Sequence, residues 1–135
     1  MKKLNRVVVT GYGLTSPIGN TPEEFWDSLV NGKIGIGKIT KFDTSEYSVH
    51  NAAEIKDFPF DKYFVKKDTN RYDNYSLYAL YAAREAVANA NIDTEAVESD
   101  RFGVILSTGI GGILEIEEQV ARMNEKGPKR IRPMA

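Results

Sequence analysis

The sequence predicts an α/β fold in which helices pack on a layered sheet. Two unbroken apolar runs, residues 7–10 and 102–108, contain β-branched side chains and suit strands that are covered on both faces. Two longer segments, residues 74–90 and the stretch after residue 112, repeat their small or apolar residues at helical spacing. Strands and helices that alternate in this way are typical of a layered α/β architecture.

A glycine-rich turn and a capped helix follow the first predicted strand. The glycines and the proline of residues 11–19 end the strand with unusual backbone angles. Thr21 is placed to cap a helix whose first position is Pro22, and we expect Glu24 to reach back to the backbone N–H of Thr21. Gly32, which follows an asparagine, marks the end of this helix.

The middle of the chain holds the most regular helical pattern. Residues 32–60 indicate loops with a short strand at 51–55, and the charged residues 61–74 indicate a short exposed helix or turn. In the long helix of residues 74–90 the small side chains share one face, which lets the helix axis approach a neighbour closely. That face consists of Ala79, Ala82, Ala83, Ala86, Val87 and Ala90. A last helix follows the second apolar run, with Ile113, Ile116, Val120 and Met123 at helical spacing.

Composition limits the classes of function. With 41% hydrophobic residues, 27% charged residues and a net charge of −1, the 135 residues are typical of a globular protein and not of a nucleic-acid binder. No apolar run reaches the ~20 residues that cross a bilayer, so we expect a cytoplasmic location without membrane contact. Cysteine is absent and His50 is the only histidine, so neither a metal site nor a Ser–His pair is indicated. We expect His50 on a surface loop.

Five segments together resemble one enzyme family. They are residues 7–20, residues 32–36 leading to 39–43, residues 71–73, residues 107–112 and residues 126–130. In this order and spacing they resemble the N-terminus of the β-ketoacyl-acyl carrier protein synthases, the condensing enzymes of fatty acid synthesis, and most closely the elongating type II enzyme. The resemblance implies a thiolase-like layered fold, of which residues 1–135 are most of the first half and an incomplete domain.

The resemblance also implies an activity and its partners. These acyltransferases condense an acyl chain with a malonyl unit, both carried as thioesters on acyl carrier protein, by decarboxylative Claisen condensation. The family's cysteine nucleophile and two histidines correspond to positions beyond residue 135. We therefore expect no catalytic residue within this chain, no activity from the chain alone, no metal or soluble cofactor, and a homodimer for the full-length enzyme.

One apolar residue and four cations take roles by the same resemblance. Ile110, between glycines, matches the inner end of the fatty acyl pocket near the dimer interface, where it would act as an apolar gate. The alternative interpretation is that these glycines only make a tight strand-to-helix connection and that Ile110 lies in the core. The basic positions that dock the acidic carrier protein match Lys67, Arg71, Lys129 and Arg130.

Alternatives to docking remain open for this charged surface. Lysines beside acidic residues often form only a solvated face with weak ion pairs. Asn70 stands where some family members carry a further cation, and Arg132 is interpreted as ordinary surface charge.

The sequence also offers two alternative functions. Residues 11–16 resemble the dinucleotide fingerprint, but Ser16 replaces its third glycine and Pro17 prevents immediate helix growth. The stronger rival is a non-catalytic structural piece that pairs with the rest of a synthase. A coding frame that continues past residue 135 into a segment with a cysteine and histidines would favour the enzyme. In either case the two apolar strands lack partners, so we expect the isolated chain to aggregate or to need a complementing piece.

Overall fold

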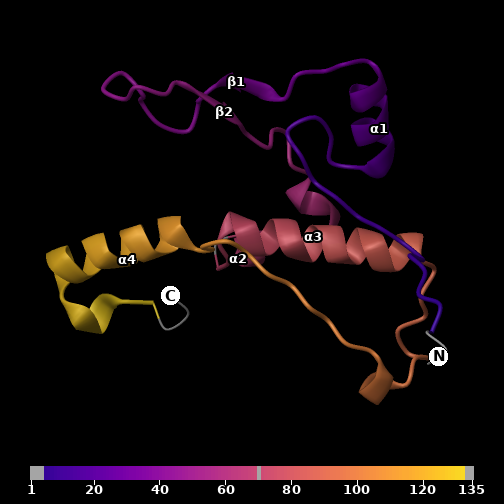
Figure 1. The fold of residues 1–135 in the computed structure, drawn as a ribbon. Coiled ribbons are helices and arrows are strands. Elements are labelled where there is room, and N and C mark those ends of the chain that lie inside the picture. The colour runs from indigo at the N-terminus through magenta and orange to yellow at the C-terminus, as the bar shows by residue number, and fades with distance from the viewer. Residues whose placement is uncertain (1–4, 70, 133–135) are drawn as a thin grey trace. The chain divides into compact units, whose positions relative to one another are not determined.

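The computed structural model describes residues 5–69 and 71–132 (Figure 1). The chain divides into two compact units, and each is described separately. The first holds the described residues up to Pro59 together with Tyr81–Val97, and the second holds Phe60–Leu80 and the described residues from Glu98 onward.

The first unit begins with the glycine-rich turn and helix α1 (Pro22–Val30). Thr21 caps α1 as predicted, since its hydroxyl accepts a 3.2 Å hydrogen bond from the backbone N–H of Glu24. The prediction for the Glu24 side chain is wrong by one residue. Its carboxylate accepts from the backbone N–H of Asn20 at 2.8 Å instead of from Thr21. The helix ends at the predicted place, with Asn31 as the C-cap residue.

A two-stranded antiparallel sheet follows. Strand β1 (Ile36–Lys38) pairs with β2 (Asn51–Ala53), with Gly37 opposite Ala52. A 2.9 Å hydrogen bond from the N–H of Ile39 to the carbonyl of His50 continues the ladder by one step. The predicted strand at 51–55 is confirmed over 51–53. β1 was not predicted, because three residues around a glycine carry too short a pattern to recognise.

The long helix α3 (Asn74–Asn89) confirms the predicted helix at 74–90. Its part from Tyr81 onward belongs to the first unit, where Tyr81 is fully buried and meets the Phe58 ring edge-on at 4.9 Å between centroids. The small face of this part packs against the glycine-rich turn. A Cβ built on Gly11 would lie 2.6 Å from the Ala90 Cβ, so the close approach expected from small residues is present.

The second unit contains the 3₁₀ turn η1 (Phe60–Lys62), the short helix α2 (Lys66–Thr69), the first part of α3, and helix α4 (Ile113–Lys126). Two further 3₁₀ turns, η2 (Ser99–Arg101) and η3 (Pro128–Arg130), lie before and after α4 in sequence. Leu77 and Phe64 are its buried apolar side chains among the described residues. The short helix predicted within 61–74 and the helix predicted after residue 112 are both confirmed.

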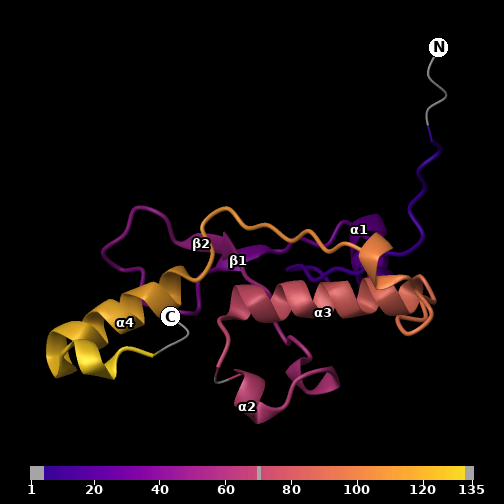
Figure 2. The same cartoon turned by 90° about the horizontal axis from the view of Figure 1, so that it is seen from below.

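The two strands predicted at residues 7–10 and 102–108 are not strands in this structure. Both segments run as ribbon without helix or strand, seen in indigo and orange (Figure 1, Figure 2). Val7 is 90% exposed and Ile105 is 95% exposed. A strand exists only with a hydrogen-bonded neighbour, and the described residues provide none for these segments. The apolar pattern therefore marks surfaces that are uncovered here.

Within the described residues no helix is long and apolar enough to cross a bilayer.

Candidate functional site

The loop that leads into α4 is a tight backbone turn. Gly111 and Gly112 both have left-handed backbone angles, with φ of 65° and 54°. Gly112 is the N-cap residue of α4. Because it is a glycine, it has no side-chain oxygen that could accept a hydrogen bond from the first helical N–H groups. A Cβ on Gly111 would lie 2.7 Å from Cγ2 of Thr108 and 3.3 Å from the Tyr75 ring. Ile110, just before this turn, is 78% exposed and is therefore not a core residue of the described structure.

Ile110 and Arg71, for which the resemblance implies separate roles, line the same cavity. This cavity has a volume of about 230 Å³ and lies within the second unit. Its walls come from the start of α3, the segment before it, the glycine turn and the first turn of α4. The lining consists of Arg71, Tyr72, Asp73, Tyr75, Ser76, Ile110, Gly111, Gly112, Glu115 and Ile116. The cavity is smaller than most small-molecule sites, and its lining includes both apolar and charged residues.

The four predicted docking cations all have exposed positions in the second unit. Lys67 lies in α2, and Lys129 and Arg130 form the end of η3. The guanidinium of Arg71 lies 5.5 Å from the centroid of the Tyr72 ring, within cation–π range. Asn70, the position of a possible further docking contact, lies outside the described residues.

Arg132 belongs to a network that sequence reasoning missed. Its guanidinium forms an ion pair with Glu115 at 3.3 Å, and its backbone N–H donates to the Gln119 side chain at 2.9 Å. A second cavity of about 290 Å³ is lined by both Arg71 and Arg132, and Glu115 contributes to it. The available signals were the four-residue spacing of Glu115 and Gln119 and the Gly127–Pro128 break, which together indicate a helix whose end turns back.

An apolar hollow of about 670 Å³ also lies in the second unit. Tyr75, Tyr78 and Leu80 of α3 line it together with Leu106 from the exposed run at 102–108, and its remaining lining residues are Tyr72, Ser76, Ala79, Ser107 and Thr108. Burial, and to a smaller extent the negative charge of Asp73, raises the pKa of the Tyr78 hydroxyl. Tyr78 therefore stays neutral at physiological pH.

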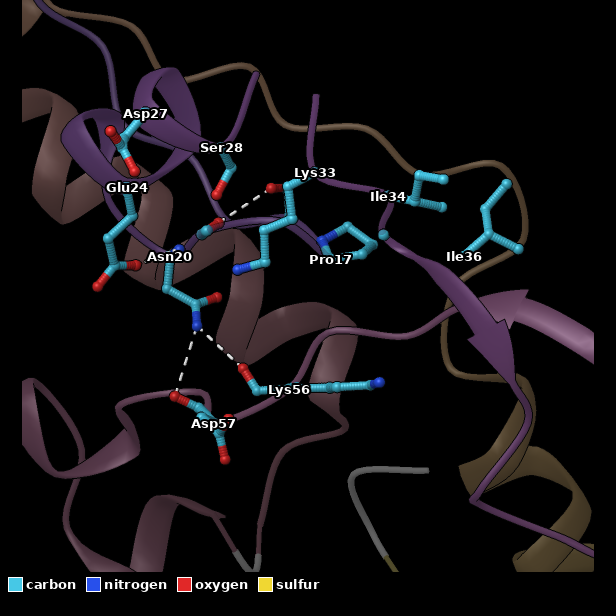
Figure 3. A pocket seen from close by; sticks show the side chains of 13 residues that line it. Pro17, Asn20, Glu24, Asp27, Ser28, Lys33, Ile34, Ile36, Lys56 and Asp57 are labelled. Carbon is cyan, nitrogen blue, oxygen red and sulfur yellow. Dashed lines mark hydrogen bonds between the residues drawn. The ribbon is translucent and has the colours of Figure 1, made fainter. Parts of the chain in front are cut away.

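The first unit has a polar cavity of about 490 Å³ beside the glycine-rich turn (Figure 3). Asn20 points from this turn toward the chain after β2, where its side-chain amide donates to the carbonyls of Lys56 at 3.0 Å and Asp57 at 3.4 Å. Opposite, the buried Ser28 hydroxyl donates to the Ile18 carbonyl at 2.6 Å. These bonds tie the turn to its surroundings, so the polar groups serve the local structure.

A nucleophile–base pair does not form around this cavity. The Ser16 hydroxyl donates to the carbonyl of Gly19 at 3.0 Å. His50 is exposed, as predicted, and its Nδ1 lies 3.2 Å from the Thr44 hydroxyl. No group of three or more metal-ligating side chains occurs among the residues that the structure describes.

Comparison with known proteins identifies the class. A model of the family "Beta-ketoacyl synthase, N-terminal domain" matches residues 4–135, so the chain belongs to this family. This confirms the resemblance drawn from the five sequence segments.

Two curated relatives carry the name of one type of synthase. The chain is 43% identical to "3-oxoacyl-[acyl-carrier-protein] synthase 2" of Staphylococcus aureus (strain COL) over 133 residues, which are 98% of this chain and 32% of that protein. It is 38% identical to the protein of the same name from Synechocystis sp. (strain ATCC 27184 / PCC 6803 / Kazusa) over 128 residues, covering 95% and 31%. The chain thus spans about a third of the length of these relatives.

Solved structures agree in fold. "The ishigamide ketosynthase/chain length factor" superposes with a TM-score of 0.71 and 28% identity over 94% of this chain and 32% of that one. A second structure, described as a type II PKS acyl-carrier protein in complex with its ketosynthase bound to the hexaketide, has a TM-score of 0.67 and 22% identity over 94% and 33%. The second likeness concerns the fold alone. Both superpositions cover 94% of this chain, so the path of the chain is shared with each structure.

Proposed function

We propose that this chain is the N-terminal part of a β-ketoacyl-acyl carrier protein synthase that elongates acyl chains in fatty acid synthesis. The malonyl thioester loses CO₂, the carbanion formed attacks the carbonyl carbon of an enzyme-bound acyl thioester, and the C–S bond to the enzyme thiol breaks. The products are a 3-oxoacyl thioester, CO₂ and the free thiol, which takes up a proton. The observation that carries this proposal is the family match over residues 4–135 together with 43% identity to a 3-oxoacyl synthase.

The nucleophile has to come from outside this chain. Acyl transfer of this kind needs an activated thiolate, and the 135 residues contain no cysteine. The chain alone is therefore inactive. The rest of the protein also provides neighbours for the apolar runs at 7–10 and 102–108, which completes the thiolase-like layered sheet. The full-length enzyme is a homodimer in the cytoplasm.

The chain contributes to substrate recognition by two means. Ile110, exposed next to a cavity, gates the inner end of the acyl pocket. Lys67, Arg71, Lys129 and Arg130 dock the acidic acyl carrier protein, and their exposure in one unit supports this role.

The test is condensation by the full-length protein. Purified enzyme is given acyl- and malonyl-acyl carrier protein, and the 3-oxoacyl product is measured by mass spectrometry alongside the CO₂ released. Equal amounts of the two products are expected from the full-length protein and none from residues 1–135 alone. A full-length protein that forms no 3-oxoacyl product would overturn the proposal and would favour the rival function, a non-catalytic structural piece.

A further inference from the structure

The chain reverses direction after α4. Gly127 ends this helix with φ of 80° and ψ of 166°, a combination that is essentially restricted to glycine, and its N–H bonds the carbonyl of Met123 at 2.9 Å. Pro128 then starts η3, whose last two residues are Lys129 and Arg130. Figure 1 shows this yellow segment turning back beside α4. Two predicted docking cations therefore lie on a turn that is anchored at its start by the helix end.

Three hydrogen-bonded residues anchor the other end of the turn. The backbone N–H of Arg132 donates to Oε1 of Gln119 at 2.9 Å, and its Nη1 lies 3.3 Å from Oε2 of Glu115. The Gln119 side-chain amide donates to the second Glu115 oxygen, Oε1, at 2.7 Å. We call Glu115, Gln119 and Arg132 the Arg132 clasp.

Burial makes this clasp more than a surface ion pair. Gln119 is 5% exposed, and both its amide oxygen and its amide nitrogen are used within the clasp. The Glu115 side chain is 22% exposed. An ion pair that is shielded and supported by a buried amide loses less to solvent screening than an exposed pair. The turn between Gly127 and Arg132 is thus fixed at both ends.

We propose that Glu115 and Gln119 are positioning residues for carrier docking, because they hold the turn that presents Lys129 and Arg130. The proposal rests on the function proposed above. A further observation supports it: Glu115 and Arg132 line the 290 Å³ cavity together with Arg71, a third docking cation. The clasp therefore borders the same cavity as Arg71.

Simple charge effects predict the opposite result for Glu115. An acidic carrier protein is repelled by a carboxylate near its docking surface, so removal of that charge should strengthen binding. If Glu115 positions the turn, its removal weakens binding. Glu117, exposed on the same helix, offers a matched control because Glu117→Gln removes the same charge outside the clasp.

The experiment compares the full-length parent protein with four separate variants of it. They are Glu115→Gln, Gln119→Leu, Glu117→Gln and the docking variant Lys129→Glu/Arg130→Glu. We measure the Kd for acyl carrier protein, and the KM and kcat for carrier-borne and pantetheine-borne acyl substrates. Glu115→Gln and Gln119→Leu should raise the Kd and the carrier KM by about three- to tenfold. For Gln119→Leu, whose residue lines neither the 230 Å³ nor the 290 Å³ cavity, kcat and the pantetheine KM should stay unchanged. Glu117→Gln should leave binding equal or slightly stronger.

Amide hydrogen exchange checks the clasp without reference to catalysis. In the parent protein the Arg132 amide should exchange slowly, and Gln119→Leu should speed its exchange. If the docking variant weakens carrier binding but both clasp variants behave like Glu117→Gln, the positioning role is wrong and docking stands. If the docking variant has no effect, or the parent does not bind carrier protein, the proposed docking fails and the inference fails with it. Equal losses on both substrates would show a merely structural role.

Discussion

Gly13 lies directly against Ala82 of α3, so closely that a Cβ built on Gly13 would collide with the Ala82 carbonyl oxygen. The atoms in the way belong largely to the helix backbone, because the same Cβ would be 2.7 Å from the N of Ala86. Backbone atoms cannot rotate aside as a flexible side chain can. The glycine-rich turn is therefore a packing element of the first unit as well as a bend in the chain.

Substitution of Gly13 should destabilise the full-length protein. Gly13→Ala forces the turn away from α3, and overpacking of this kind costs about 1–3 kcal/mol in the free energy of unfolding. The denaturant midpoint measures the loss. The control is Gly37→Ala, since the nearest atom to a Cβ at Gly37 is the flexible Lys56 Nζ at 4.0 Å. Equal midpoints for the two variants would show that Gly13 does not pack on α3.

A hydrogen bond beside the two-stranded sheet favours the charged form of Glu54. The Thr40 hydroxyl donates to Glu54 at 2.8 Å and holds the pKa of that carboxyl below its usual value, although partial desolvation acts in the opposite direction. Because the unfolded chain binds this proton more readily, the stabilisation is complete above the ordinary pKa of about 4.3 and is lost as the pH falls through the lowered folded value.

Thr40→Val should raise the Glu54 pKa toward the ordinary value. The titration is followed by ¹³C NMR of labelled glutamate carboxyls in the full-length protein, with Glu54→Gln to assign the signal. An unchanged titration midpoint in the valine variant would exclude the Thr40 hydroxyl as the cause.

Ile110 should control acyl chain length. Ile110→Phe in the full-length enzyme adds volume at the proposed inner end of the pocket, so long acyl chains should acylate the enzyme more slowly, by about tenfold or more, while short chains react almost normally. The measurement is the acylation rate of the variant and the parent enzyme with acyl chains of increasing length. The same rates for every chain length in variant and parent would remove Ile110 from the pocket.

The isolated 135-residue chain should expose apolar surface. Val7, Val9 and Ile105 are 86–95% exposed, and such contiguous apolar segments promote association. Strong binding of a hydrophobic dye and concentration-dependent light scattering are expected. A monomer that unfolds cooperatively and binds no dye would contradict this prediction.

Helices were easier to predict from this sequence than strands. Thr21 and the small face of α3 carry local information, in the form of a cap and a 3.6-residue repeat, and both were predicted correctly. Val7 and Ile105 were assigned to strands because their runs are apolar, but a strand depends on a neighbour that no local pattern reveals.

The site shows the same limit at the level of side chains. The docking roles of Lys129 and Arg130 come from the resemblance and stay predictions. The Arg132 clasp could not be predicted in this way, because it joins residues 17 positions apart through a chain reversal. Ile110 and Arg71 were recognised separately, and only the folded chain brings them to one cavity.

The most direct test of the account compares two forms of one substrate. In the full-length enzyme, Lys129→Glu/Arg130→Glu should raise the KM for acyl-acyl carrier protein by about tenfold or more and leave the KM for the free acyl thioester unchanged, because in the proposed docking only the carrier contacts these cations. Equal KM values for variant and parent with the carrier-borne substrate, or equal losses on both substrates, would contradict a carrier-docking role for this chain.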